Sequence, residues 1–277
     1  MRQDTVDCAR PSVTYATPLG PFFMYSPHSA DRRRKERNHS MKHTWINSDQ
    51  TQNRLLKNLP PHEQQQLLQW CSLIDLPDKR VLCEQGEVFS CVYFPHNSVV
   101  SMVSVLEDGA MVEVATIGNE GFVGVPVLLG VDKAVARILV QVPGRASRMG
   151  IDAFREALDR CPRLNALAHN YAHALLSQVT RSGGCNSHHS TEERCARWLL
   201  MTADRAGSLE IPYTQEFLAT ILNVSRPRMN IAIGVLQKAG LIKATKGHIE
   251  IVDRQGLEDA SCECYRAIRE EFDRFLL

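Results

Sequence analysis

Two short apolar segments separated by Asn223 constrain this chain most strongly, in the stretch from Thr214 to Gly240. Apolar residues recur at helical spacing on both sides of this Asn, which predicts two short helices. Thr214 and Ser225 are placed to cap the first and the second helix. Asn tolerates the left-handed backbone conformation that a tight turn between helices requires. The stretch is therefore expected to form a helix-turn-helix.

The N-terminal residues of the second helix carry side chains suited to reading DNA. In a helix-turn-helix, these residues enter the major groove. Arg bridges O6 and N7 of guanine, and Asn reads adenine. The inner face of this helix is expected to comprise Ile231, Val235 and Leu236. An ordinary two-helix corner with a solvated Arg pair is the alternative. The candidate DNA contacts are Thr214, Gln215, Ser225, Arg226, Arg228 and Asn230.

A β-hairpin is predicted directly after the second helix. Ile249 and Ile251 alternate with polar residues, behind a turn at Lys246-Gly247. Such a hairpin would be the wing of a winged helix, with Lys246 and His248 placed to meet phosphate. A winged helix is a less accidental pattern than a two-helix corner, so double-stranded DNA is the expected partner. Because the formal net charge is only +1, DNA affinity would come from a local basic patch.

Short β-rich runs separated by turns dominate residues 74–149. Many short strands at this spacing predict an antiparallel β-roll of the jelly-roll type. Helical segments are expected on both sides, over 53–71 and 151–160, with Asp152 as the N-cap of the second. The expected strands are residues 81–83, 92–94, 99–106, 111–117 and 137–142.

A long helix is predicted to begin at Pro162, followed by another that a capping box opens at Ser190-Thr-Glu-Glu193. The apolar residues of the long helix lie near heptad spacing over barely three heptads. Such a helix could pack against its counterpart in a second copy of the chain. Packing on its own β-roll alone is the other possibility. The expected dimer seam comprises Leu164, Leu167, Tyr171, Leu175 and Gln178.

These elements predict an α+β fold with a β-roll, a connecting helix and a winged helix-turn-helix. Prolines and a charge run at 31–37 predict a disordered N-terminal extension, favoured as a solvated tail over a DNA contact. Met41 follows closely and is an alternative start. The expected segments are the extension at 1–48, the β-roll sensor domain at 49–160, the dimerisation helix at 161–189, the DNA-binding domain at 190–255 and a helical tail at 256–277.

Several classes of protein are disfavoured by what the sequence lacks. It has no apolar run long enough for a membrane span and no signal-peptide pattern. Nine cysteines without a disulfide-framework spacing favour reduced thiols in the cytoplasm. An enzyme is not expected, because nucleophile-elbow, phosphate-loop and metalloprotease motifs are absent. No metal site is expected, because Cys185 with His188 and His189, and Cys262-Glu-Cys264, each fall short of four ligands.

The layout and several motifs resemble the Crp/Fnr family of bacterial transcription regulators over about residues 50–255. This resemblance implies a homodimer that binds a palindromic operator and contacts RNA polymerase. It places Arg226 where the family has its main guanine-reading Arg. Pro227 and Ile231 replace a Glu and a second Arg of the cyclic AMP receptor branch, so the operator should differ, with Arg228 and Asn230 as substitutes. The motifs are residues 92–95, 112–118, 120–124, 178 with 185–186, 193–194 with 197–200, and 214–219 through 236–242.

The effector is left open by the same resemblance. In the cyclic-nucleotide branch, a Gly-Glu pair and an Arg-Ser pair hold the ribose and the cyclic phosphate. The corresponding candidates here are Gly118, Glu120, Gly121 and Arg137, but the Arg-Ser pair is absent, which disfavours a cyclic nucleotide. An iron-sulfur cluster is disfavoured because Cys8 is the only cysteine of the N-terminal segment. Haem stays possible, and a sensor module without a DNA-binding role is the alternative function.

Overall fold

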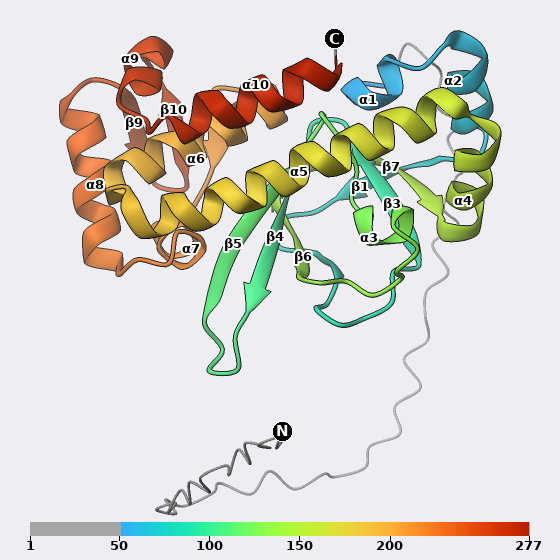
Figure 1. Cartoon of the computed structure of the whole chain (residues 1–277). Coiled ribbons are helices and arrows are strands. Elements are labelled where there is room, and N and C mark those ends of the chain that lie inside the picture. The colour runs from blue at the N-terminus through green and yellow to red at the C-terminus, as the bar shows by residue number, and fades with distance from the viewer. Residues whose placement is uncertain (1–50, 277) are drawn as a thin grey trace, which may run out of the picture. The chain divides into compact units, whose positions relative to one another are not determined.

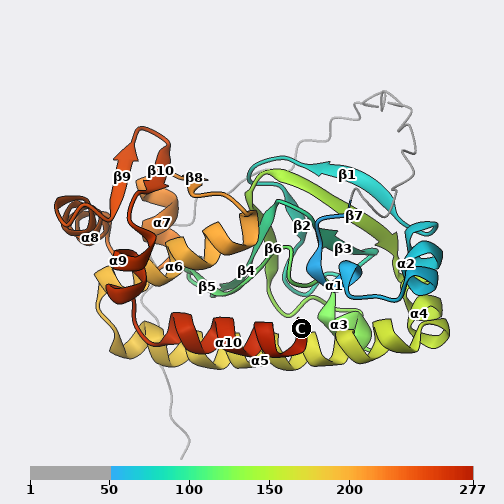
Figure 2. The same cartoon turned by 90° about the horizontal axis from the view of Figure 1, so that it is seen from above.

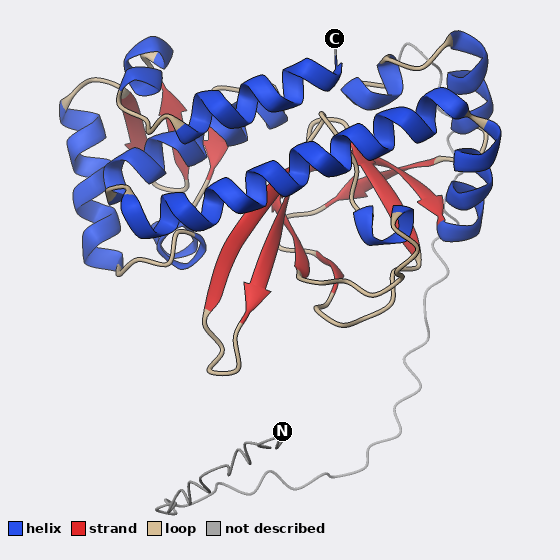
Figure 3. Cartoon of the chain, viewed as in Figure 1, coloured by secondary structure: helices blue, strands red, loops and turns tan. Residues whose placement is uncertain are grey.

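The computed structural model describes residues 51–276, and the extension predicted over residues 1–48 lies outside them. Along these residues an antiparallel β-roll, a long helix and a smaller unit of helices and short strands follow one another (Figures 1 and 3). The predicted α+β class and the order of its parts are confirmed. Among the described helices, none is both long and apolar enough to cross a membrane.

The β-roll consists of two antiparallel sheets, and their buried residues belong to one hydrophobic core that continues into the helices. The expected strands are present, and two unexpected strands join one of them, residues 91–95, in the smaller sheet. The first sheet has the order β1 (Ser72–Leu76), β7 (Gly144–Gly150) and β3 (Cys91–Pro95). The second has the order β2 (Val81–Cys83), β6 (Arg137–Val142), β4 (Val99–Val105) and β5 (Met111–Ile117).

Short helices flank the roll. Asn53 caps the first of them, because its side chain accepts a hydrogen bond from the Leu56 amide at 3.1 Å. The expectation that Asp152 caps the fourth helix is wrong: Gly150 is the N-cap residue, and Asp152 lies in the first turn, where its charge complements the helix dipole. The helices are α1 (Arg54–Lys57), α2 (Pro61–Leu68), α3 (Val125–Leu128) and α4 (Ile151–Arg160).

The long helix α5 (Pro162–His188) packs against the roll, and the C-terminal helix α10 (Cys264–Leu276) runs alongside it (Figure 2). Tyr171 illustrates this packing, since its ring lies 5.2 Å from the Phe122 ring of the roll and 5.9 Å from the Phe272 ring of α10. Both helices therefore contribute to one core.

The predicted dimer seam is wrong for this structure, because its residues face the interior of their own chain. Apolar spacing marks the face of a helix that is buried, but it does not tell which surface buries that face. In α5 the roll and α10 do so. All five seam residues are at most 5% exposed: Leu164, Leu167, Tyr171, Leu175 and Gln178.

The C-terminal unit begins with α6 (Thr191–Ala206), which opens with the predicted capping box. The Glu193 amide donates to Ser190 Oγ at 3.2 Å, and the Ser190 amide donates to Glu193 Oε2 at 2.8 Å. A small antiparallel sheet of order β8-β10-β9 packs with the helices of this unit. Its elements are β8 (Glu210–Pro212), α7 (Gln215–Ile221), α8 (Arg226–Lys238), β9 (Ile242–Thr245), β10 (His248–Ile251) and α9 (Arg254–Asp259).

Candidate nucleic-acid interface

Helices α7 and α8 form the predicted helix-turn-helix. Thr214 caps α7, because its hydroxyl accepts a hydrogen bond from the Phe217 amide at 3.1 Å. Asn223 adopts a φ of 49° in the turn, which is the left-handed conformation that the sequence predicted. The Thr214 cap determines where α7 begins, and the turn at Asn223 determines where α8 can begin.

One face of α8 packs into the unit, and the other face is open. The predicted inner face is partly wrong, because Ile231 is 63% exposed and Val235 is 47% exposed. The turn instead directs Met229 inward, and this side chain is fully buried. Ser225 is the N-cap residue as expected, but its hydroxyl makes no capping hydrogen bond. The inner face comprises Met229, Ala232, Ile233 and Leu236.

Strands β9 and β10 form the predicted wing. Ile249 and Ile251 are buried, and the chain reverses at Gly247, whose φ of 89° favours glycine. The Tyr213 amide donates to the Gly247 carbonyl at 2.9 Å, which ties the wing tip to the residue preceding Thr214. The wing is therefore held in a fixed position beside α7.

The predicted DNA contacts are all exposed. Arg226 and Arg228 lie in the first turn of α8, and neither forms an ion pair with a carboxylate of residues 51–276. By contrast, Arg254 pairs with Asp204 at 2.6 Å. Both α8 guanidinium groups can therefore contact phosphate or base edges without losing an internal partner. The eight exposed residues are Thr214, Gln215, Ser225, Arg226, Arg228, Asn230, Lys246 and His248.

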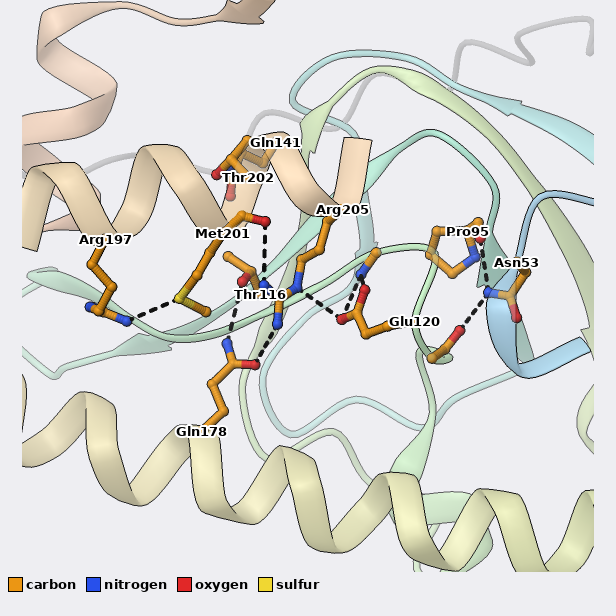
Figure 4. Close-up of polar contacts among 12 residues, drawn as sticks. Asn53, Pro95, Thr116, Glu120, Gln141, Gln178, Arg197, Met201, Thr202 and Arg205 are labelled. Atoms are coloured by element: carbon orange, nitrogen blue, oxygen red, sulfur yellow. Dashed lines mark hydrogen bonds and ion pairs between the residues drawn. The ribbon is translucent and has the colours of Figure 1, made fainter. Parts of the chain in front are cut away.

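A buried polar network docks α6 on the roll and on α5 (Figure 4). Arg205 of α6 donates to Glu120 Oε1 at 2.9 Å and to Gln178 Oε1 at 2.9 Å. Gln178 in turn donates to Thr116 of β5 at 3.3 Å. Arg205 and Glu120 are both nearly inaccessible, so their charges depend on each other. This network was not predicted, because its members are far apart in the sequence.

The candidate effector residues do not come together as a pocket. Glu120 is engaged by Arg205 and by the Gly118 amide, whereas Arg137 pairs with Glu84 at 2.7 Å. A Cβ atom at Gly121 would lie 1.8 Å from the Tyr171 ring, so this glycine allows close packing. A Cβ atom at Gly118 would lie 2.3 Å from the side chain of Arg205. The prediction that these residues bind an effector is therefore not supported.

A second polar chain links the roll to α6. Ser101 Oγ lies 2.6 Å from both Glu113 Oε2 and Gln141 Oε1, and Gln141 Nε2 donates to Thr202 Oγ1 at 3.0 Å. Burial raises the pKa of Glu113 to about 7. The Ser101 hydroxyl has one proton and can donate it to only one of these two oxygens. When Glu113 is protonated, its own O–H donates to Ser101 Oγ, and the Ser101 hydroxyl then donates to Gln141 Oε1.

The structure also brings together four side chains that the sequence did not connect. Cys185 and His189 at the end of α5 meet Cys262 and Cys264 at the start of α10. Each half looked too small for a metal site in the sequence, and only the packing of α10 on α5 unites them.

Two domain families match the chain. Residues 73–161 match the cyclic nucleotide-binding domain, and residues 193–260 match the Crp-like helix-turn-helix domain. Together the matches span more than half of the chain. No curated protein matches the sequence.

Solved structures share the fold at low sequence identity. A Crp/Fnr-family regulator from Eubacterium rectale is 13% identical, with a TM-score of 0.56 over 74% of this chain and 96% of that one. The c-di-GMP-responsive regulator CLP of Xanthomonas campestris is 14% identical, with a TM-score of 0.57 over 69% and 99%. FixK2 of Bradyrhizobium japonicum is 12% identical, with a TM-score of 0.55 over 69% and 98%.

Proposed function

The chain belongs to the Crp/Fnr family of transcriptional regulators, and we propose that it recognises a specific operator in double-stranded DNA through α8 and the wing. The observation that carries this proposal is the presence of two exposed guanidinium groups, those of Arg226 and Arg228, in the first turn of α8. Bidentate contacts from Arg to guanine are the commonest specific contacts in the major groove.

Each exposed residue has a role in this proposal. Arg226 reads a guanine, and Arg228 and Asn230 read neighbouring bases. The hydroxyl of Ser225, which is not used in capping, donates to a phosphate. On the wing, Lys246 and His248 contact the backbone of the same duplex. Thr214 and Gln215 at the start of α7 approach the adjacent phosphates.

A homodimer on a palindromic operator is part of the same proposal. A stripe of exposed residues on α5 recurs every three or four positions, which is the spacing of a coiled-coil seam. Leu176 at the centre of this outer stripe is 64% exposed. We place the dimer contact here. Two recognition helices would then lie about 34 Å apart, so half-sites recur one DNA turn apart. The outer stripe comprises Ala166, His169, His173, Leu176, Thr180 and Gly183.

Such a dimer would work in the cytoplasm and would contact RNA polymerase when bound upstream of a gene. The test begins with selection of the preferred sequence from a random DNA pool by the full chain. Fluorescence anisotropy then compares this sequence with a scrambled one at fixed salt, because salt alone changes the affinity. We expect Arg226→Ala to cost roughly 1–3 kcal/mol on the selected sequence and to relax one operator position.

Arg266→Ala is the matched control, because Arg266 is an exposed Arg of α10 outside the proposed interface. This variant should keep the wild-type affinity. Equal affinity of the wild-type protein for selected and scrambled DNA would contradict the proposal and would favour a sensor module without a DNA-binding role. Equal losses in both Arg variants would contradict the role given to α8.

A further inference from the structure

Four side chains with metal-binding atoms meet where α5 ends and α10 begins. Cys185 lies in the last turn of α5, and His189 is the C-cap residue of that helix. Cys262 and Cys264 approach from the α9–α10 connection and from the first residue of α10. The three thiols are at most 5% exposed, and they form a small core of their own. These four residues are called the Cys–His cluster below.

The spacing of the donor atoms fits a single metal ion. All four donor atoms lie within 4.8 Å of one another. Cys185 Sγ lies 3.5 Å from Cys262 Sγ, and Cys264 Sγ lies 3.8 Å from His189 Nδ1. Two sulfur ligands at about 2.3 Å from one tetrahedral zinc ion lie about 3.8 Å apart. The thiols are far from the length of a disulfide bond, which is about 2.05 Å.

The His189 ring is oriented as a metal ligand requires. Its Nδ1 atom faces the thiols, and its Nε2 atom lies 3.2 Å from Glu263 Oε2. Metal-binding histidines usually donate their second ring N–H to a carboxylate, which fixes the ring and raises its basicity. Glu263 lies between Cys262 and Cys264 in the sequence, which places its carboxylate within reach of the second nitrogen of the His189 ring.

Two buried arginines provide a matching charge. Arg194 and Arg197 are each 6% exposed, and neither forms an ion pair with a carboxylate within the described part of the chain. Both interact electrostatically with Cys185. Three thiolates around a divalent ion carry a net charge of −1. A metal–thiolate centre would therefore offset buried positive charge that no carboxylate of residues 51–276 pairs with directly.

We propose that the Cys–His cluster binds one zinc ion through three thiolates and the Nδ1 atom of His189. A closed set of three Cys and one His is typical of structural zinc sites. Each thiol releases its proton to solvent as zinc binds, and no electron is transferred. The inference goes beyond the proposed DNA binding, and its test does not depend on it.

The position of the ion gives it a structural role. His189 directly precedes Ser190, the N-cap residue of α6, so the site lies at the joint between α5 and the DNA-binding unit. It also fixes the first residue of α10 to the last turn of α5. Zinc would hold three helices in one arrangement at this joint.

The metal content of the full chain tests the proposal. Protein produced with zinc in the medium and purified without chelators should contain about one zinc per chain by mass spectrometry of the metal. Cobalt added to metal-depleted protein should give the absorption of a tetrahedral cobalt–thiolate centre. Cys264→Ser should lose most of the zinc, whereas Cys91→Ser, in a strand of the roll, should retain it.

A conservative variant keeps the test valid if Cys264→Ser does not fold. His189→Cys replaces one zinc ligand by another and should retain about one zinc, whereas His189→Ala should lose most of it. Wild-type protein without bound metal would overturn the proposal, and iron in place of zinc would overturn the assignment of the metal. A Cys185–Cys262 disulfide in protein purified under reducing conditions, mapped by peptide mass spectrometry, would also overturn it.

Discussion

Glu113 is a half-buried carboxyl whose protonation state should be visible in the stability of the whole chain. Burial raises its pKa to about 7, and Ser101 lies in hydrogen-bond contact with it. The folded state therefore holds a proton that the unfolded state releases at about pH 4.3. This contribution to the free energy of unfolding is fully present below that pH and is lost as the pH rises through 7.

We expect Glu113→Gln to remove this dependence. The free energy of unfolding from urea titrations, compared between pH 5 and pH 8, should fall in the wild type by up to about 3 kcal/mol more than in the variant. The comparison with the variant is essential because His96 acts in the opposite direction. Burial lowers the pKa of His96 to about 4, so its contribution grows as the pH rises.

Glu107→Gln is the control, because Glu107 lies exposed in the turn between β4 and β5. It should follow the wild-type profile at both pH values. Parallel profiles of wild type and Glu113→Gln would show that the carboxyl is already ionised in the folded protein.

The residues whose roles could be predicted from the sequence act over a few positions. Thr214 caps a helix that begins one residue later, and Asn223 supplies a turn by its own backbone conformation. Glu120 and Arg205 are 85 positions apart, and the sequence around either residue gives no indication that the two form a pair. The candidate effector site is not supported for this reason, because Arg205, which occupies Glu120 in the folded chain, lies too far along the sequence to be connected with it.

At the scale of elements, apolar spacing predicted which segments form helices and strands. It was less successful in predicting which other elements each of them packs against. Strand β7 was missed because its sequence, GRASRMG, has little apolar character, and its pairing with β1 and β3 defines it. In α5 the apolar spacing correctly marked the buried face. That face packs against the roll and α10, and the sequence of α5 alone does not indicate these packing partners.

The outer stripe of α5 carries the prediction at this scale. Leu176→Glu should convert the proposed dimer to a monomer, because two charged side chains would meet at the centre of the proposed contact and the burial of two Leu side chains would be lost. Sedimentation velocity would measure the mass. Val135→Glu is the matched control, since Val135 is 69% exposed outside α5. A Leu176→Glu protein that remains dimeric would place the contact on another surface.

At the scale of the molecule, α6 joins the roll to the DNA-binding unit through buried polar contacts. Arg205 joins Glu120 and Gln178, and Gln141 donates to Thr202, so polar groups of both parts are buried at their contact. Separating the roll from the DNA-binding unit would break these hydrogen bonds and leave the charges of Arg205 and Glu120 without each other. We therefore expect residues 51–276 to unfold in one transition.

The fluorescence of two tryptophans, one in each part of the molecule, can test whether both parts unfold together. Trp198 lies in α6, and Trp70 follows α2 beside the roll. In a Trp45→Phe background, variants that retain only one of the two should report the same urea midpoint. Glu120→Gln leaves Arg205 buried without its counter-charge and should cost roughly 3–5 kcal/mol. The midpoint at Trp198 should then fall below the midpoint at Trp70.

Glu84→Gln is the control for the loss of an ion pair as such. Its partner Arg137 is 30% exposed and Glu84 is 42% exposed, so the loss should be at most about 1 kcal/mol, and both tryptophans should still report one midpoint. Two separate midpoints already present in the wild-type protein would mean that the buried network does not join the halves. In that case α8 would not be held relative to the roll, and a signal in the roll could not reach α8 through Arg205.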